Sequence, residues 1–363
     1  MSDDYSASSV SRVLIIRLSA IGDVVFASPL AAAIQNRFPG AQIDWLAEDT
    51  VAPLIQHHPD IHEVIIWPRK IWSQHWRRGR LLALLGSVLA FRKALKARQY
   101  ELVVDAQGLL KSAVLGWLSG AHRRVSFRSK EPTSWLVGER IEKDVSPRIS
   151  SEYRALAQYL GCDTRQFPLR IALPDAVLEW LAQFRRAEPY VVLSPFTTRP
   201  QKHWPEAHWR QLADEISQAG WRVVVLGAPA DVESAERIFD GISIESMVGK
   251  TTLLESAALV SGAQLVIGVD TGLTHMGWAF SVPTIALFGS TFPYRAPEGL
   301  RGEVLYRDMA CSPCRRKPTC GGSFDCLGGI TVEQVIATAK RYYYTSTPLA
   351  PVIASSAVER EFD

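Results

Sequence analysis

The sequence lacks an apolar run long enough to cross a membrane. Its longest candidate segment, residues 81–91, is well short of the roughly 20 apolar residues that a spanning helix needs. It also shows no secretory signal, because the start, Met1 to Asp4, is acidic and the first apolar run is interrupted by Arg17 and Asp23. We therefore expect a cytoplasmic protein.

Cysteine is scarce, with five in 363 residues, and four of the five are Cys311, Cys314, Cys320 and Cys326. This clustering argues against a disulfide framework spread over the chain. The spacing fits either a structural zinc site or a reduced, packed loop, and both interpretations stay open. A catalytic metal is not expected, because four thiolate ligands would leave zinc no open position.

Acidic residues are missing from one long stretch. Residues 64–100 hold nine Lys or Arg and no Asp or Glu, although the net charge of the chain is only +3. Within this stretch, Trp67, Trp72 and Trp76 alternate with cations, namely Arg69, Lys70, Arg77, Arg78 and Arg80. Such a surface suits an acidic, phosphorylated acceptor or an anionic membrane face, and part of it is also explained as the solvated side of a helix. Nucleic acid is not an expected partner, because the overall charge is nearly balanced.

Length and composition predict a soluble protein of two domains. The chain is 47% hydrophobic and 21% charged, and 363 residues exceed one typical hydrophobic core. Apolar runs of strand length alternate with helical stretches, which favours an open parallel α/β sheet in each half. The expected strands are residues 12–16, 43–47, 63–67, 102–105, 124–127, 190–194, 222–226, 265–269 and 284–288. The expected helices include residues 28–37, 81–97, 109–118, 175–186 and 273–280.

We predict the following domain boundaries. Residues 1–11 form a disordered tail, 12–170 an N-terminal domain, 171–188 a linker region, 189–345 a C-terminal domain and 346–363 a flexible tail. Both domains are expected to be doubly wound, with ligands bound beyond the carboxyl ends of the strands, in a cleft between the domains. A dinucleotide is not indicated, since Gly-x-Gly-x-x-Gly follows neither the first strand nor residues 190–194.

The stretch from Asp270 to His275 carries the strongest functional signal. An apolar strand ends at Asp270, and Gly272 then begins a helix whose N-terminus favours negative charge. Asp270, Thr271 and His275 place a carboxylate, a hydroxyl and an imidazole at that point. A phosphorylated ligand is one interpretation, and an ordinary helix cap is the other.

Three further polar stretches follow expected strands. Asp23 could accept a proton from an attacking hydroxyl or simply complement a helix dipole. Thr197, Thr198 and Lys202 could hold a pyrophosphate or belong to a solvated loop. Glu233 could bind ribose hydroxyls or be an exposed helical glutamate.

Four motifs, taken in order, resemble glycosyltransferase family 9, the bacterial heptosyltransferases of the lipopolysaccharide inner core. They are residues 19–23 (SAIGD), 105–112 (DAQGLLKS), 202–209 (KHWPEAHW) and 270–275 (DTGLTH). The resemblance extends from about Arg12 to Arg341. It implies a GT-B fold, with two Rossmann-like domains, the acceptor on the first and the nucleotide sugar on the second.

The resemblance also implies a reaction: inverting transfer of heptose from ADP-heptose, with no cofactor and no catalytic metal. It implies Asp23 as general base and Glu233 as the ribose ligand. The implied phosphate contacts are Thr197, Thr198, Lys202, Asp270, Thr271, Gly272 and His275. The implied acceptor side comprises Ser19, Gly22, Arg69, Lys70, Gln107 and Lys111. The implied partner is a lipopolysaccharide precursor at the inner face of the cytoplasmic membrane.

The motifs do not agree on a subtype. The Asp105 and Lys202 motifs resemble heptosyltransferase I, which acts on the first Kdo sugar of Kdo-lipid A. The cysteine cluster resembles heptosyltransferase II, which acts on a heptosylated core, and the histidine often seen near residues 150–154 is absent here. A nucleotide-sugar epimerase of the same fold and a non-catalytic binding protein are the alternative functions.

Overall fold

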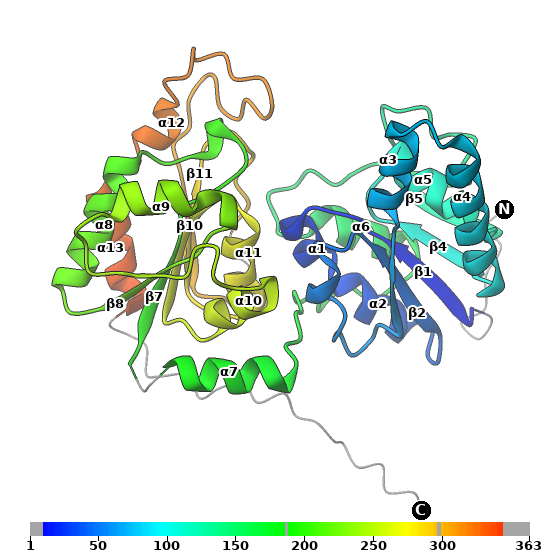
Figure 1. Ribbon diagram of the computed structural model, residues 1–363, viewed down its shortest axis with the longest axis horizontal. Coiled ribbons are helices and arrows are strands. Elements are labelled where there is room, and N and C mark those ends of the chain that lie inside the picture. The colour runs from blue at the N-terminus through cyan, green and yellow to red at the C-terminus, as the bar shows by residue number, and fades with distance from the viewer. Residues whose placement is uncertain (1–9, 186–187, 296–298, 344–363) are drawn as a thin grey trace, which may run out of the picture.

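The computed structural model describes residues 10–185, 188–295 and 299–343, which form two α/β domains side by side (Figure 1). Both predicted tails lie outside the described residues, except Val10 and Ser11. Within the described ranges, no helix is long and apolar enough to span a bilayer.

The N-terminal domain is built on a parallel six-stranded sheet of order β3-β2-β1-β4-β5-β6. Its strands are β1 (Arg12–Ile16), β2 (Gln42–Ala47), β3 (Glu63–Ile66), β4 (Leu102–Asp105), β5 (Arg123–Phe127) and β6 (Glu139–Ile141). Its helices are α1 (Ile21–Ala27), α2 (Pro29–Arg37), η1 (Ala52–Leu54), α3 (Arg69–Arg77), α4 (Leu81–Ala97), α5 (Leu110–Leu118) and α6 (Ser151–Tyr159).

The two faces of this sheet are covered separately, as the alternation of side chains along β1 requires. Val13 and Ile15 pack in a core with residues of α2 and α6, whereas Leu14 and Ile16 pack with residues of α4 and α5. All four of these side chains are fully buried. Strands buried on both faces explain why the sequence shows continuous apolar runs here.

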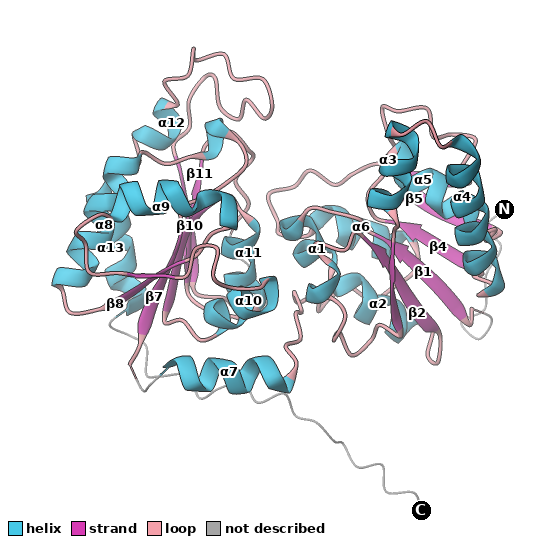
Figure 2. Ribbon diagram, in the orientation of Figure 1, coloured by secondary structure: helices cyan, strands magenta, loops and turns pink. Residues whose placement is uncertain are grey.

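The C-terminal domain repeats this architecture with the strand order β12-β11-β10-β7-β8-β9 (Figure 2). Its strands are β7 (Tyr190–Ser194), β8 (Arg222–Val225), β9 (Glu245–Ser246), β10 (Leu265–Val269), β11 (Thr284–Phe288) and β12 (Gly302–Tyr306). Its helices are α7 (Asp175–Arg185), η2 (Pro200–Lys202), α8 (Glu206–Gln218), η3 (Pro229–Asp231), α9 (Val232–Phe239), α10 (Leu253–Ser261), α11 (Gly272–Ala279), α12 (Asp325–Gly328) and α13 (Val332–Tyr343).

Strand register places the candidate site residues at the carboxyl ends of the strands in each sheet. Ile16 at the end of β1 lies opposite Leu46 of β2 and Asp105 of β4. In the second sheet, Ser194 of β7 lies opposite Gly268 of β10, and Val269 lies opposite Leu287 of β11. Because the strands are parallel, the segments that follow them leave each sheet on the same side.

The segment expected to be a linker packs on the C-terminal domain. Leu169, Ile171, Leu173 and residues of α7 join a core cluster with Val192 and Met276. Val25 of α1 belongs to the same cluster, so buried apolar contacts also join the two domains. The domain boundaries themselves stay predictions.

Candidate active site

Asp23 stands in the first turn of α1 and is paired with a buried arginine. The Arg17 guanidinium forms an ion pair with the Asp23 carboxylate and donates a hydrogen bond of 3.0 Å to the carbonyl of Ala106. The backbone N–H of Ala20 donates to Asp23 at 3.3 Å. The Asp23 side chain is 47% exposed, against 7% for Arg17. Asp23 is therefore oriented from the protein side and open to a ligand on the other.

Asp270 is the centre of a second network, which follows β10. Its carboxylate pairs with the ammonium of Lys202, accepts a hydrogen bond from the Thr291 hydroxyl and lies 3.1 Å from Nε2 of His275. Burial alone would raise the pKa of Asp270, but the His275 hydrogen bond and the Lys202 charge hold it well below its ordinary value. Asp270 therefore stays ionised and fixes the positions of Lys202 and His275.

The proton arrangement on His275 follows from its neighbours. Trp278 donates to the hydroxyl oxygen of Tyr294 at 3.2 Å, and that hydroxyl lies 2.7 Å from Nδ1 of His275. Because the ionised Asp270 carboxylate can only accept, a neutral His275 ring would carry its proton on Nε2, and Nδ1 would then accept from the Tyr294 hydroxyl. Burial, followed by the Asp270 charge, raises the pKa of Tyr294 well above its ordinary value, so the hydroxyl stays protonated.

The N-termini of α1 and α11 meet between the two domains (Figure 1). A Cβ on Gly22 would lie 2.5 Å from Cδ2 of His275, and a Cβ on Gly272 would collide with Ile21. Phe26 of α1 lies 4.5 Å from the His275 ring, measured between ring centres. Two helix N-termini thus face each other, an arrangement that favours an anion near both.

The remaining predicted donor residues lie in the segments that follow β7, β8 and β10. The Thr197 carbonyl is 2.8 Å from Nε2 of His203, whereas Thr198 is exposed. Thr271 is the N-cap of α11, but its side chain makes no capping hydrogen bond, so its hydroxyl is not used by its own helix. Glu233 is exposed in the first turn of α9.

The predicted acceptor-side cations are arranged around acidic residues that follow β2. Glu48, which is 8% exposed, binds Arg69 at 3.0 Å and Lys111 at 3.5 Å. Asp49 binds Lys70 at 2.6 Å. Strand register explains why these acidic residues and cations lie together, because β2 ends beside β1 and beside β3, the strand that leads into α3. These three cations line the side of the N-terminal domain on which Asp23 lies.

Asp105 organises the loop that carries the second family motif. Its buried carboxylate accepts hydrogen bonds from the backbone of Gln107 and Gly108 and from the hydroxyls of Ser112 and Ser126, at 2.9–3.1 Å. The Gln107 side chain accepts a hydrogen bond of 2.8 Å from the backbone N–H of Leu18. This bond ties the loop to the β1 turn that contains the half-buried Ser19.

The four clustered cysteines are not assembled as metal ligands. A tetrahedral zinc site needs sulfur atoms about 3.8 Å apart, given Zn–S bonds of about 2.3 Å. Of Cys311, Cys314, Cys320 and Cys326, no three have sulfur atoms within 4.8 Å of one another. Backbone hydrogen bonds from Phe324 and Gly322 lower the pKa of Cys320, whereas burial raises the pKa of Cys326.

The one compact group of possible metal ligands among the described residues lies elsewhere. Asp44, His62 and Glu63 come within 4.8 Å of one another, but Arg98 forms ion pairs with both carboxylates. Arg98 therefore supplies the positive charge that these two carboxylates require.

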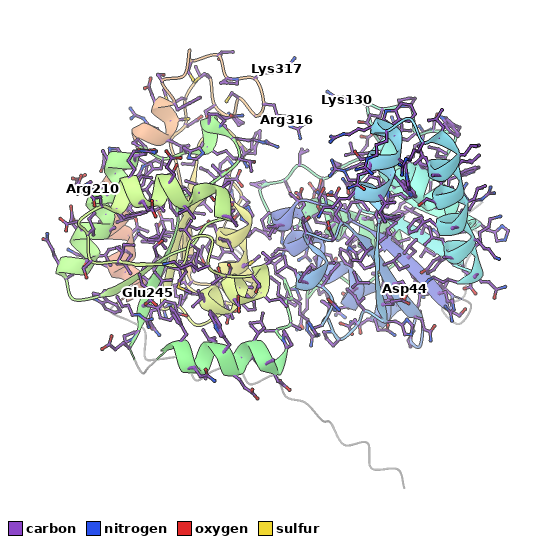
Figure 3. The ribbon with its side chains drawn as sticks, viewed as in Figure 1. Asp44, Lys130, Arg210, Glu245, Arg316 and Lys317 are labelled. Carbon is purple, nitrogen blue, oxygen red and sulfur yellow. The ribbon has the colours of Figure 1, made fainter. Side chains whose placement is uncertain are left out.

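Figure 3 shows Asp44 far from Lys130, Arg316 and Lys317, which extend from the facing sides of the two domains.

Several residues that the sequence analysis did not assign belong to these networks. Arg17 and Glu48 each follow an apolar strand, and Thr291 and Tyr294 follow β11. A polar residue directly after a buried strand is the signal that could have indicated Arg17 and Glu48, whereas Thr291 and Tyr294 lie further along the loop after β11. Their partners could not be read from the sequence, because each network joins segments that come from different strands.

Comparison with known proteins identifies the family. The family model for glycosyltransferase family 9 (heptosyltransferase) matches residues 88–323. The chain is 33% identical over 331 residues to lipopolysaccharide heptosyltransferase 1 of Pseudomonas aeruginosa, covering 85% of this chain and 87% of that protein. It is 32% identical over 306 residues to lipopolysaccharide heptosyltransferase 1 of Escherichia coli K12, covering 83% of this chain and 93% of that protein.

Solved structures agree in fold. The E. coli heptosyltransferase WaaC with ADP-2-deoxy-2-fluoro heptose matches with a TM-score of 0.70 and 29% identity, covering 91% of this chain and 99% of that one. A family 9 glycosyltransferase from Veillonella parvula matches with a TM-score of 0.78 and 20% identity, covering 94% of this chain and 100% of that one. The expected GT-B fold is confirmed, and the chain belongs to glycosyltransferase family 9, the heptosyltransferases.

Proposed function

We propose that this enzyme transfers heptose from ADP-heptose to a Kdo sugar of a lipopolysaccharide precursor, with inversion at the anomeric carbon. The observation that supports it most is the meeting of α1 and α11 between the domains. This contact brings the turn that holds Asp23 next to the helix N-terminus that follows Asp270. The heptosyltransferase 1 relatives, similar over most of their length, support the same reaction.

On the donor side, charge that develops on the leaving diphosphate requires stabilisation. Lys202 and the backbone N–H groups at the start of α11 would supply it, with Thr197, Thr198, Thr271 and His275 as hydrogen-bonding groups. Gly272 leaves room for Ile21 of α1 to pack against the start of α11, and Glu233 would hold the ribose. Asp270 would act indirectly, because it orients Lys202 and His275.

On the acceptor side, Asp23 is the proposed general base. The acceptor hydroxyl oxygen bonds to the anomeric carbon, the bond from that carbon to the diphosphate oxygen breaks, and the hydroxyl proton passes to Asp23. ADP leaves with the bonding electrons. Arg17 would keep the carboxylate pointed at the hydroxyl, since it is held by Ala106 on the side away from solvent.

The acceptor would be recognised as an anion. Arg69, Lys70 and Lys111 suit the carboxylate of a Kdo sugar or a phosphate on the lipid, while Ser19, Gly22 and Gln107 shape the turn beside Asp23. Direct contact with the inner face of the cytoplasmic membrane follows from a lipid-linked acceptor and belongs to the same proposal.

Mass spectrometry of the lipid product tests this assignment. Incubation of the enzyme with ADP-heptose and Kdo-bearing lipid A should add the mass of one heptosyl residue. Addition only to an acceptor that already carries heptose would favour the heptosyltransferase II type instead. No addition to either acceptor, by enzyme that binds ADP-heptose, would refute the proposed reaction.

For the cysteine loop, a structural zinc ion stays a proposal that rests on the spacing of the four thiols. The ion would require the loop to tighten, because the sulfur atoms are too widely spaced here. Elemental analysis of protein purified under reducing conditions separates the two interpretations, because one zinc per chain that is lost from Cys311→Ser would support the zinc site. A metal-free, fully folded protein would leave the packed, reduced loop as the correct interpretation.

A further inference from the structure

Exposed apolar side chains gather on the α3–α4 hairpin of the N-terminal domain, residues 69–97. Fifteen large hydrophobic residues are exposed in the described chain, and seven of them fall between Ile66 and Leu89. On α4, Leu82 is 87% exposed, and Leu81, Leu85 and Leu89 are at least half exposed. Positions 82, 85 and 89 share one helical face, so these leucines form a continuous stripe.

The inner face of the hairpin packs on the domain, so the exposed stripe is not an effect of poor packing. Nε1 of Trp72 donates to the Ser87 hydroxyl at 3.0 Å, and the Trp72 ring packs edge-on against Phe91 with ring centres 5.6 Å apart. Trp72, Val88 and Phe91 pack on the core that includes the fully buried Leu95. The inner face of the hairpin is therefore satisfied, and the leucine stripe is left facing outward.

Cations lie at both ends of this stripe. Exposed Arg77 ends α3, and exposed Arg78 and Arg80 lie in the connection to α4. At the other end of α4, Leu89 shares a shallow surface hollow of about 460 Å³ with Arg92, Lys93, Lys96 and Ala97. No acidic residue occurs anywhere in residues 64–100. The leucine stripe is thus flanked by cations, as in helices that lie in a membrane interface.

We propose that the α3–α4 hairpin docks on an anionic lipid bilayer, with Trp76, Leu81, Leu82 and Leu85 entering the interface and the surrounding Arg and Lys binding lipid phosphates. Charge decides between a bilayer and a second copy of the chain. A two-fold contact through this stripe would bring two sets of like cations together with no acidic partner inside residues 64–100. An anionic bilayer satisfies the leucines and the cations at once.

The same hairpin leads directly into the acceptor side of the site. It begins at Arg69, whose guanidinium lies over the Trp67 ring, and Nζ of Lys111 lies 5.7 Å from the centre of that ring. Figure 1 places α4 on the outer flank of the N-terminal domain, away from the C-terminal domain. Docking through α3 and α4 would hold Arg69, Lys70 and Lys111 near the lipid surface while the donor domain stays free. This inference deepens the proposed function and rests on it for the lipid-linked acceptor.

Co-flotation of the full chain with vesicles of phosphatidylethanolamine and phosphatidylglycerol tests the docking surface. Leu82→Glu combined with Leu85→Glu should lower vesicle binding by about tenfold or more. Arg77→Gln, Arg78→Gln and Arg80→Gln together should lower it by about tenfold and reduce its salt dependence. Val145→Glu, at a residue 83% exposed elsewhere in the same domain, is the matched control and should bind like the wild type.

Turnover separates failure of docking from failure of the proposed reaction. The Leu82→Glu, Leu85→Glu variant should lose activity on acceptor embedded in vesicles but keep it on acceptor dispersed in detergent. Unchanged vesicle binding by both variants would overturn the docking surface, as would wild-type protein that does not bind the vesicles. If sedimentation shows a wild-type dimer that dissociates in the leucine variant, the proposal would also be overturned, because a second copy of the chain would then cover the stripe. Vesicle binding without turnover on any acceptor would instead refute the proposed reaction alone.

Discussion

Gly22 of the N-terminal domain touches His275 of the C-terminal domain so closely that no side chain fits between them. A Cβ on Gly22 would lie 2.5 Å from Cδ2 of His275, closer than such contacts occur. His275 is held in turn by Asp270 and Tyr294, so it has no free direction in which to move. Gly22 is therefore one of the positions where the two halves of the site are in close contact.

Gly22→Ala should separate the two halves of the site. We expect turnover to fall by about tenfold or more, because a shift of about 1 Å at reacting groups is that costly. The free energy of unfolding should fall by about 1–3 kcal/mol from overpacking. Steady-state kinetics and urea unfolding measure both effects. Gly86→Ala is the matched control, since a Cβ there meets nothing within 4 Å, and wild-type turnover by Gly22→Ala would contradict this account.

Asp23→Asn should lose about 100-fold or more in kcat, because the amide cannot accept the hydroxyl proton. It should also lower the free energy of unfolding, because the buried Arg17 loses the charge of its carboxylate partner. ADP binding should stay near the wild-type affinity. The measurement is the initial rate of transfer, with ADP binding followed by calorimetry. Asp163→Asn serves as the control, since Asp163 forms an exposed pair with Arg165. Full turnover by Asp23→Asn would show that another group is the base.

Lys202→Met should weaken ADP binding by about tenfold or more, since it removes the cation proposed to meet the diphosphate. It also leaves the Asp270 carboxylate, which is only 12% exposed, without its ammonium partner, so the free energy of unfolding should fall as well. Titration calorimetry with ADP reports the first effect and urea unfolding the second. Lys340→Met, at an exposed position on α13, should change neither quantity. Unaltered ADP affinity in Lys202→Met would remove Lys202 from the donor site.

The sequence could predict most of the fold because strands buried on both faces are continuous apolar runs. The predicted strands at residues 12–16, 102–105, 190–194, 265–269 and 284–288 agree with the observed ones at both ends. The edge strands β6, β9 and β12 were not predicted, because each is short or only half-buried and has no apolar run of its own. The exposed helix α3 was not predicted for a similar reason, since none of its residues is buried.

Some of the candidate residues that the sequence singled out lie together in the structure, but their contacts could not be predicted. Asp23, Lys202, Asp270 and His275 were chosen because they follow strands, and the structure brings Lys202, Asp270 and His275 into one network. The ion pairs could not be predicted, because they depend on the register of β1, β2 and β4. They join Arg17 to Asp23, and Glu48 to Arg69 and Lys111. Gly272 was expected to face phosphate, and the structure adds a contact with Ile21 that the sequence did not suggest.

His58 should make the stability of the N-terminal domain depend on pH. Burial lowers the pKa of His58 from 6.5 to about 4, with Asp60 opposing the shift and Arg170 adding to it. The unfolded chain therefore binds a proton as pH falls below about 6.5, whereas the folded chain does not until about pH 4. The contribution of His58 to the free energy of unfolding is complete above about pH 6.5 and declines between about pH 6.5 and about pH 4. The loss is about 2 kcal/mol by about pH 5.

Urea unfolding at about pH 7.5 and about pH 5 measures the difference in the free energy of unfolding between the two pH values. In His58→Asn this difference should shrink by most of the loss of about 2 kcal/mol. The adjacent His57 is exposed, so His57→Asn should keep the wild-type pH dependence. An unchanged difference in His58→Asn would mean that His58 is not the group responsible.

The release of ADP from ADP-heptose in EDTA, with and without Kdo-bearing lipid A, is the decisive measurement for a metal-independent transfer. We expect slow release without acceptor and at least about 100-fold faster release with it, because Asp23 and the α11 N-terminus act without a divalent ion. Release that requires a divalent ion, or that does not respond to the acceptor while ADP-heptose still binds, would contradict it.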